Sequence, residues 1–214
     1  MEKLKSSITN MVLVLTGVAI VTGGILAYIN HVTEEPIKVQ KEKTLADGIK
    51  SVMGGGELKV VKTDTVRQND AKGKELTYII YQTQDSKQKD LGAAVESTTG
   101  GFGGDLKILV GFDPDGNILG YTLLEHAETP GLGAKADKWF QKGQKGDIIG
   151  KNPKEKLTVS KDGGKVDAIT ASTITSRAFL LAVNNAYSAY KATPVDANTG
   201  ATKQNADNNK DSKK

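Results

Sequence analysis

The segment LKILVGFDPDGNILGYTLLEH, residues 106–126, contains a clear signal for a β-hairpin. Two apolar runs, 106–112 and 118–126, flank the polar pentapeptide DPDGN at 113–117. Its proline presets φ, and its Asp-Gly pair tolerates the positive φ that a tight reversal needs. The segment therefore predicts two antiparallel strands joined by a short turn.

Further strands and helices are predicted on either side of this hairpin. Strand-like residues fill the segments LKVVKTDTV (58–66), LTYIIYQT (76–83) and LGAAVEST (91–98). A helix is predicted from Thr44, where apolar residues recur at helical spacing until GGG at 54–56, and another in the apolar segment 176–190. The predicted fold class for residues 45–192 is α+β, a mostly antiparallel sheet with packed helices.

The first thirty residues contain the longest apolar segment of the chain. No Asp, Glu, Lys, Arg or His occurs between Lys5 and His31. Residues 11–30 are long enough to cross the hydrocarbon layer of a bilayer, about 30 Å thick, as one helix. A cleaved signal peptide is the alternative, but its apolar core is ordinarily shorter. We therefore predict an uncleaved transmembrane helix at 11–30, preceding the folded domain.

This helix divides the chain into predicted parts. They are a cytoplasmic N-terminus (1–10), the membrane helix (11–30), a juxtamembrane linker (31–44), an extracytoplasmic domain (45–192) and a disordered tail (193–214) with almost nothing apolar to bury. Lysines on both sides of the helix balance each other, but the short N-terminal tail is the easier end to keep in the cytoplasm. The predicted location is the cell (inner) membrane, with a single pass.

The composition excludes several classes of function. The chain has 29 basic and 25 acidic residues, interspersed along most of its length, and a net charge of +4. This pattern is typical of a solvated surface and not of a nucleic-acid-binding stripe. The absence of cysteine excludes disulfides, thiolate-bound zinc and cysteine-ligated iron–sulfur clusters. Only two histidines occur, so no metal site is predicted.

A cluster of alcohols precedes the last predicted helix. The segment VDAITASTIT, residues 166–175, contains Thr170, Ser172, Thr173 and Thr175. One serine or threonine is enough to cap a helix, so these hydroxyls exceed that need. The start of a helix also favours phosphate, because unpaired N–H groups and the positive end of the dipole converge there. A threonine at this position is suited to bind a phosphate or to carry one as an ester.

The segment DAITASTITS (167–176) resembles the flavinylation motif of the FMN-binding domain family. That motif is an Asp that precedes a unit of four residues, Ser/Thr-Gly-Ala-Thr, which is followed by another Ser/Thr. The threonine that ends the four-residue unit is joined to FMN by a phosphoester bond. The resemblance implies that Thr173 is the covalent acceptor. The other motif positions are Asp167, Thr170, Ser172 and Thr175.

Two inner positions depart from the motif. Ala171 stands where glycine is usual and would resist a positive φ. Ser172 stands where alanine is usual, and its hydroxyl is a competing acceptor.

A second segment, HAETPGLGAKA (126–136), resembles the Glu-Thr-Pro-Gly-Leu-Gly segment that lies against the flavin ring in the same family. Alone, it would indicate a proline–glycine turn after a strand. Its glycines let backbone N–H groups approach ring carbonyl oxygens, and its leucine can pack on the apolar ring face. The implied ring-lining residues are Glu128, Thr129, Gly131, Leu132 and Gly133. Whether Phe102 contacts the ligand is left open.

A membrane helix before such a domain is similar to the G subunit of Rnf complexes and to the C subunit of sodium-pumping NADH:quinone reductases. The compact chain favours the Rnf-type subunit. The resemblance implies an electron-transfer subunit with covalent FMN and no catalytic site of its own, in a complex that couples ferredoxin:NAD electron transfer to Na⁺ or H⁺ translocation. The expected partners are the other subunits of that complex and an FMN transferase that loads the flavin.

Three other interpretations remain open. The chain could be the FMN-carrying subunit of a sodium-pumping quinone reductase or of another extracytoplasmic flavin reductase. It could also be an anchored module that binds a phosphate ligand without a covalent bond, which leaves the segment at 128–133 unexplained. A scaffolding role explains neither motif.

Overall fold

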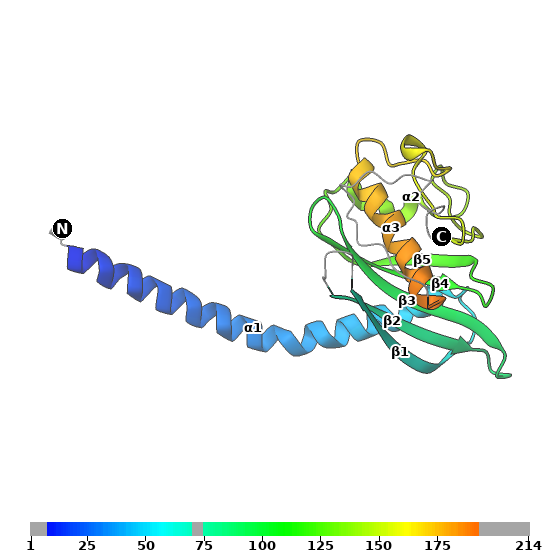
Figure 1. The fold of residues 1–214 in the computed structure, drawn as a ribbon. Helices are drawn as coiled ribbons and strands as arrows, with labels where there is room; N and C mark the ends of the chain where they lie inside the picture. Colours follow the sequence, from blue (N-terminus) through cyan, green and yellow to red (C-terminus); the bar gives the residue numbers. More distant parts are fainter. Residues whose placement is uncertain (1–7, 70–74, 193–214) are drawn as a thin grey trace. The chain divides into compact units, whose positions relative to one another are not determined.

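The computed structural model describes residues 8–69 and 75–192. Within them, five strands form one antiparallel sheet in the order β1-β2-β3-β4-β5, so each strand pairs with its neighbour in sequence (Figure 1). The strands are β1 (Lys59–Asn69), β2 (Glu75–Gln84), β3 (Asp90–Gly100), β4 (Asp105–Phe112) and β5 (Ile118–His126). They occur where the sequence predicts them, and the α+β fold class is confirmed. The predictions for residues 1–7 and for the tail at 193–214 lie outside the described residues.

The predicted hairpin joins β4 to β5. The Asp113 N–H donates to the Asn117 carbonyl oxygen at 3.0 Å, and the Asn117 N–H donates to the Asp113 carboxylate at 2.7 Å. Gly116 adopts the positive φ, 94°, that the reversal requires.

Helical elements lie before and after the sheet. They are α1 (Ile8–Val52), the 3₁₀ turn η1 (Gly133–Lys135), α2 (Ala136–Trp139), the 3₁₀ turn η2 (Ser160–Asp162) and α3 (Thr173–Tyr190). The last of these starts slightly earlier than the predicted helix at 176–190.

α1 differs from the prediction because it is one continuous helix with Pro36 in its interior. We expected a linker at 31–44 and a new helix from Thr44. Proline removes one N–H donor from the helix, and here the helix continues past it. By length and composition α1 is able to cross a membrane, and its apolar window is fully exposed. Of the two compact units in the chain, the second begins at Leu45, so the end of α1 packs with the sheet.

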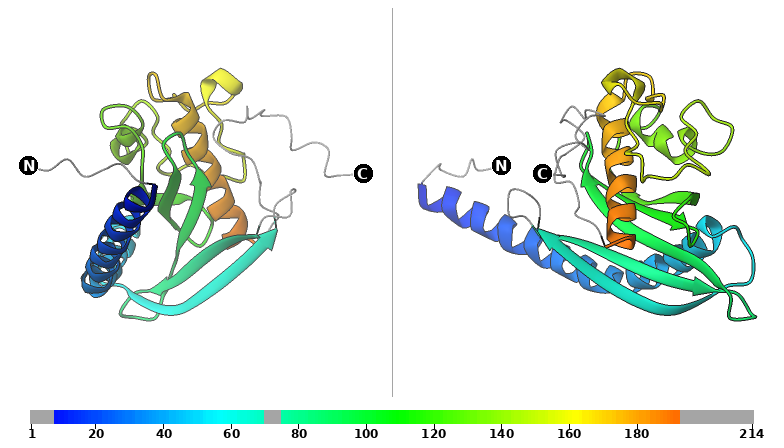
Figure 2. Two further views of the ribbon diagram at one scale, coloured as in Figure 1. Left: turned by 90° about the vertical axis from the view of Figure 1, so that its left-hand side faces the viewer. Right: turned by 45° about the vertical axis from the view of Figure 1, so that its right-hand side comes forward.

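The sheet is covered on both faces by different elements. α3 packs on β3 and β4 and fills the larger core on one face (Figure 2). Side chains alternate across a strand, so neighbouring residues such as Val95 and Ala94 belong to opposite faces. The second cluster contains Ile49, Val52, Met53, Ala94 and Leu109.

A pair of glycines lets the end of α1 approach the sheet. Gly111 in β4 and Gly120 in β5 lie directly opposite each other. A β-carbon on either residue would press against the backbone carbonyl of Val52, and at Gly111 it would collide with it. This close approach explains the absence of side chains at both positions.

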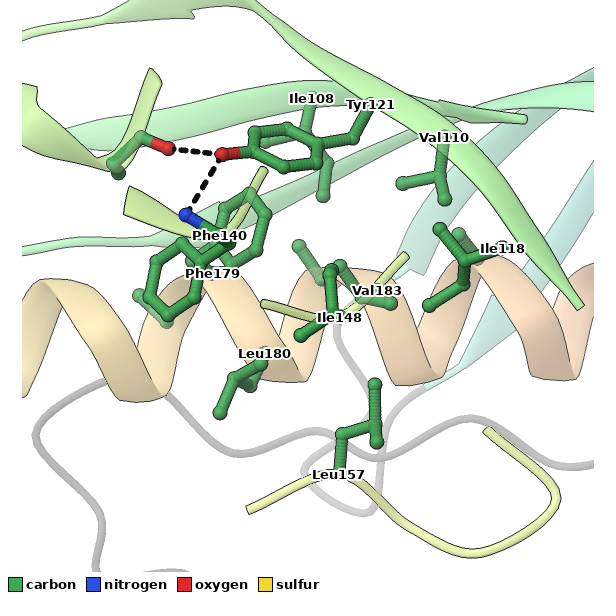
Figure 3. Close-up of a cluster of buried hydrophobic side chains, with 14 of the residues drawn as sticks. Ile108, Val110, Ile118, Tyr121, Phe140, Ile148, Leu157, Phe179, Leu180 and Val183 are labelled. Carbon is green, nitrogen blue, oxygen red and sulfur yellow. Dashed lines mark hydrogen bonds between the residues drawn. The ribbon is translucent and has the colours of Figure 1, made fainter. Parts of the chain in front are cut away.

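Tyr121 connects β5 to the segment that follows the second motif (Figure 3). Its hydroxyl donates to the Ala136 carbonyl oxygen at 2.7 Å and accepts from the Phe140 N–H at 3.1 Å. The Phe140 ring stacks on Phe179 of α3 at 4.3 Å between centroids. Residues 133–140 are therefore held between the sheet and α3, which also positions the segment 128–133.

Candidate functional site

The alcohol cluster lies at the start of α3, as predicted. Ser172 is the N-cap residue with φ −136° and ψ 47°, but no side-chain hydrogen bond caps the helix within the described structure. The Ser172 carbonyl instead accepts from the N–H of Ser176 at 3.0 Å and from its hydroxyl at 2.9 Å. Ordinary side-chain capping by Ser172 therefore does not explain the hydroxyls, and the N–H groups of the first turn keep their capacity to bind an anion.

Ala171 adopts the left-handed conformation that the sequence suggested it would resist. Its φ is 59°, a value shared by few non-glycine residues in this chain. The structure thus has, at this position, the backbone for which the family motif carries glycine. Ala171 therefore has a strained backbone directly before Ser172, the N-cap residue, and Thr173, the first residue of α3.

Glu128 connects the two motifs through a buried carboxylate. Its side chain is only 5% exposed, and one oxygen accepts from the Thr175 hydroxyl at 2.7 Å. The other accepts from the backbone N–H groups of Phe102 at 2.7 Å and Gly103 at 3.3 Å. Three donors compensate for burying the charge. The β3–β4 turn, the segment after β5 and the first turn of α3 are therefore held together at this residue.

Gly133 is required by the same contact. A β-carbon there would collide with the Glu128 carboxylate and lie 2.7 Å from the Thr175 hydroxyl oxygen. The second motif therefore needs its last glycine for close packing against the first turn of α3.

A cavity of about 360 Å³ opens where these segments meet. Its volume is within the range of small-molecule sites. It is lined by residues of both motifs and of the β3–β4 turn, namely Phe102, Glu128, Thr129, Leu132, Gly133, Ala171, Ser172, Thr173, Ile174 and Thr175. Phe102 and Leu132 contribute exposed apolar side chains, 68% and 42% exposed, at its edge.

Three of the predicted site residues do not line this cavity. Gly131 and Thr170 are exposed and outside it. Asp167 accepts from the Ser160 hydroxyl at 3.3 Å, and its backbone carbonyl accepts from the Trp139 indole at 2.8 Å. Their roles in the site remain predictions.

Sequence reasoning missed a cation at the site. The Lys161 ammonium, on η2, donates to the Thr173 hydroxyl oxygen at 3.3 Å. The next residue, Asp162, accepts from Arg177 of α3 through both oxygens at 2.7 Å. These hydrogen bonds raise the pKa of Arg177, so its guanidinium remains charged. No periodicity or motif in the sequence indicates that Lys161 contacts Thr173 or that Asp162 contacts Arg177.

Another cavity, of about 750 Å³, lies between the segments 151–158 and 163–166. Lysines dominate its charged lining, and it contains none of the motif residues. Within the described chain, no group of three or more His, Asp or Glu residues is placed to hold a metal ion. The cavity at the start of α3 is therefore the candidate site, because residues of both motifs and a buried carboxylate line it and Lys161 contacts its Thr173.

Comparison with known proteins identifies the family. Residues 101–188 match the FMN-binding domain, and residues 1–52 match the RnfG N-terminal region. The G subunit of the ion-translocating oxidoreductase complex of Vibrio cholerae serotype O1 is 32% identical over 180 residues, which cover 81% of this chain and 86% of that protein. The chain belongs to the family of G subunits of ion-translocating oxidoreductase complexes.

Other G subunits agree with this assignment. The Shewanella baltica protein is 33% identical, with 78% of this chain and 82% of that protein covered. The Yersinia pestis protein is 34% identical, with 76% and 80% covered. The chain can also be superposed on the crystal structure of Shewanella oneidensis NqrC with a TM-score of 0.42. The superposition covers 61% of this chain and 70% of the NqrC chain, at 23% sequence identity. The three G subunits confirm the predicted resemblance and the role as a subunit of an oxidoreductase complex.

The residues of this G subunit fit an FMN molecule. The cavity is lined by the start of α3 and by the apolar side chains of Phe102 and Leu132, and Lys161 contacts one of its lining residues, Thr173. FMN has a phosphate at one end and a flat, largely apolar ring system at the other. The half-buried Thr173 lies on the cavity wall where the first turn of α3 begins.

Proposed function

We propose that this G subunit carries FMN through a phosphoester bond to the Thr173 hydroxyl and relays electrons within a membrane-bound Rnf-type complex. That complex would couple ferredoxin:NAD electron transfer to translocation of Na⁺ or H⁺. The observation that carries the proposal is the cavity in which the segment 128–133 meets Thr173 at the start of α3. Membership of the G-subunit family supports the assignment to the complex.

Each part of the site has a distinct role in this proposal. Thr173 supplies the bond, and the N–H groups of the first helical turn face the phosphate. Glu128 holds the three converging segments in place. Phe102 and Leu132 provide an apolar surface for the ring and limit its contact with water.

FMN, when bound, supplies one-electron transfer chemistry, so the chain itself needs no nucleophile or general base for a reaction. A covalent link would also prevent loss of the cofactor where free FMN is scarce. An FMN transferase would load the site. α1 would anchor the subunit in the inner membrane in a single pass, with the domain from Leu45 on the extracytoplasmic side.

Intact-mass spectrometry tests the covalent link. The full chain is produced with and without an FMN transferase, and the wild type should gain the mass of FMN less one water only with the enzyme. Thr173→Ala should abolish the gain. Ser172→Ala and Thr170→Ala are matched controls that should retain it.

Two outcomes would contradict the proposal. A gain that persists in Thr173→Ala would move the acceptor to another hydroxyl. A wild type that binds FMN reversibly but never gains mass would favour the non-covalent phosphate-binding interpretation.

A further inference from the structure

We infer that Lys161 is a positioning residue for the FMN phosphate and discriminates phosphorylated from unphosphorylated flavin. This inference rests on the proposed function only in the identity of the ligand, because it does not need the covalent bond. Its starting point is the contact of 3.3 Å between the Lys161 ammonium and the Thr173 hydroxyl oxygen.

Lys161 is available for an anion. Within the described residues its one hydrogen-bond partner is the neutral hydroxyl of Thr173, and it forms no salt bridge there. The Arg177 guanidinium, in contrast, is already paired with a carboxylate. Arg177, one turn further along α3, is bound to the Asp162 carboxylate at 2.7 Å. A phosphate at the Thr173 hydroxyl would therefore meet the Lys161 ammonium, which no carboxylate neutralises within the described residues.

The turn that carries Lys161 is held firmly against α3. The Asp162 side chain has 0% exposure and that of Arg177 has 17%, so this ion pair is largely shielded from water. The turn is also tied to the segment that follows it, since the Ser160 N–H donates to the Val166 carbonyl at 2.8 Å. Lys161 therefore projects from a fixed backbone, although its own side chain is exposed.

The chemistry favours a phosphate group over a neutral ligand. An ammonium has three donor hydrogens, so a hydrogen bond to the Thr173 oxygen leaves two for phosphoryl oxygens on that side. Charge-assisted hydrogen bonds are stronger than neutral ones, and the start of α3 adds a favourable dipole. Lys161 and the start of α3 would act on the phosphate, whereas Phe102 and Leu132 are the apolar side chains available to the ring.

Binding of FMN and riboflavin to the full chain, produced without transferase, tests the inference. The two ligands share the ring and differ in the phosphate, so the ratio of their affinities isolates the phosphate contact. Wild type should bind FMN more tightly than riboflavin. In Lys161→Gln the ratio of the two affinities should be about three- to tenfold smaller, as expected for the loss of one exposed charge contact. Lys161→Arg should retain most of it.

Lys165→Gln is the matched control, since the Lys165 side chain is 89% exposed, lies 4.0 Å from Glu155 and lines the other cavity. It should keep the wild-type ratio. Added salt should reduce the preference of the wild type more than that of Lys161→Gln. A wild type without preference for FMN, or a Lys161→Gln variant with the wild-type ratio, would overturn the inference. Failure of covalent loading alone would overturn the proposed link to Thr173 and leave this result intact.

Discussion

Ala171 illustrates how a single residue stores strain next to the proposed attachment point. Its φ of 59° is unfavourable for any residue with a β-carbon, and glycine would adopt it freely. The sequence identified this position as a departure from the motif. The structure adds that the left-handed backbone is retained in spite of the methyl group.

Ala171→Gly should therefore stabilise the fold by about 1 kcal/mol, after allowing for the larger entropy of glycine in the unfolded chain. Urea denaturation of the full chain in detergent measures the change. Ala127→Gly, at an exposed residue without positive φ, is the control and should destabilise slightly. Equal effects of the two substitutions would show that Ala171 is not strained.

Glu128 and Thr175 should be energetically coupled, because the carboxylate accepts the buried hydroxyl hydrogen at 2.7 Å. Glu128→Gln should cost about 1–3 kcal/mol of unfolding free energy, since an NH₂ group would replace one of the two accepting oxygens and face a donor. A double-mutant cycle with Thr175→Val should give a coupling of about 1 kcal/mol or more. Thr175→Ser keeps the hydroxyl and should show little effect. Additive losses in the cycle would mean that the contact contributes nothing.

At the scale of the elements, the site depends on η2 being fixed to α3 by the Asp162–Arg177 pair. Both oxygens of the buried carboxylate are used, and Lys161 precedes Asp162 directly. Breaking one partner of a buried pair leaves the other charge uncompensated.

Asp162→Asn should lower the unfolding free energy by about 3 kcal/mol. Asp64→Asn is the control, since the Asp64 carboxylate is partly exposed and pairs with the exposed Lys62. It should change stability by less than about 0.5 kcal/mol. Thermal denaturation of both variants compares them directly, and a similar small effect for Asp162→Asn would refute the anchoring role of this pair.

The elements also show what was predictable from sequence. The hairpin at 106–126 depends on turn chemistry and local alternation, so its strands and its turn occur where expected. Residues 31–44, predicted as a linker, belong instead to α1, which continues past Pro36. The contacts of Lys161 with Thr173 and of Asp162 with Arg177 join irregular segments to a helix, and nothing in their spacing indicated them.

At the scale of the whole molecule, we expect buried and half-buried tyrosines to make the domain sensitive to alkali. Burial raises the pKa of Tyr121 above its ordinary value of 10.0, and Tyr81 and Tyr190 are shifted in the same direction, mainly by burial. The folded protein therefore favours the neutral phenols. This stabilisation is complete below the pKa of the unfolded chain, near 10, and is lost as the pH rises above it.

The unfolding free energy should accordingly stay level from about pH 8 to about pH 10 and fall as the pH rises further. Tyr121→Phe should show a shallower fall, because one shifted group is removed, although it should be less stable at about pH 8 through loss of two hydrogen bonds. Urea denaturation across this pH range measures both effects. An unchanged pH dependence in Tyr121→Phe would show that this phenol does not contribute.

The whole account centres on the identity of the residue that carries FMN, and peptide mapping tests this most directly. Trypsin cleaves after Lys165 and Arg177, so one peptide, VDAITASTITSR, contains every hydroxyl of the cluster. After production of the full chain with an FMN transferase, fragmentation of this peptide should place the FMN phosphoryl group on Thr173. Modification of Ser172 or Thr170 instead, or an unmodified peptide from a loaded protein, would contradict the account.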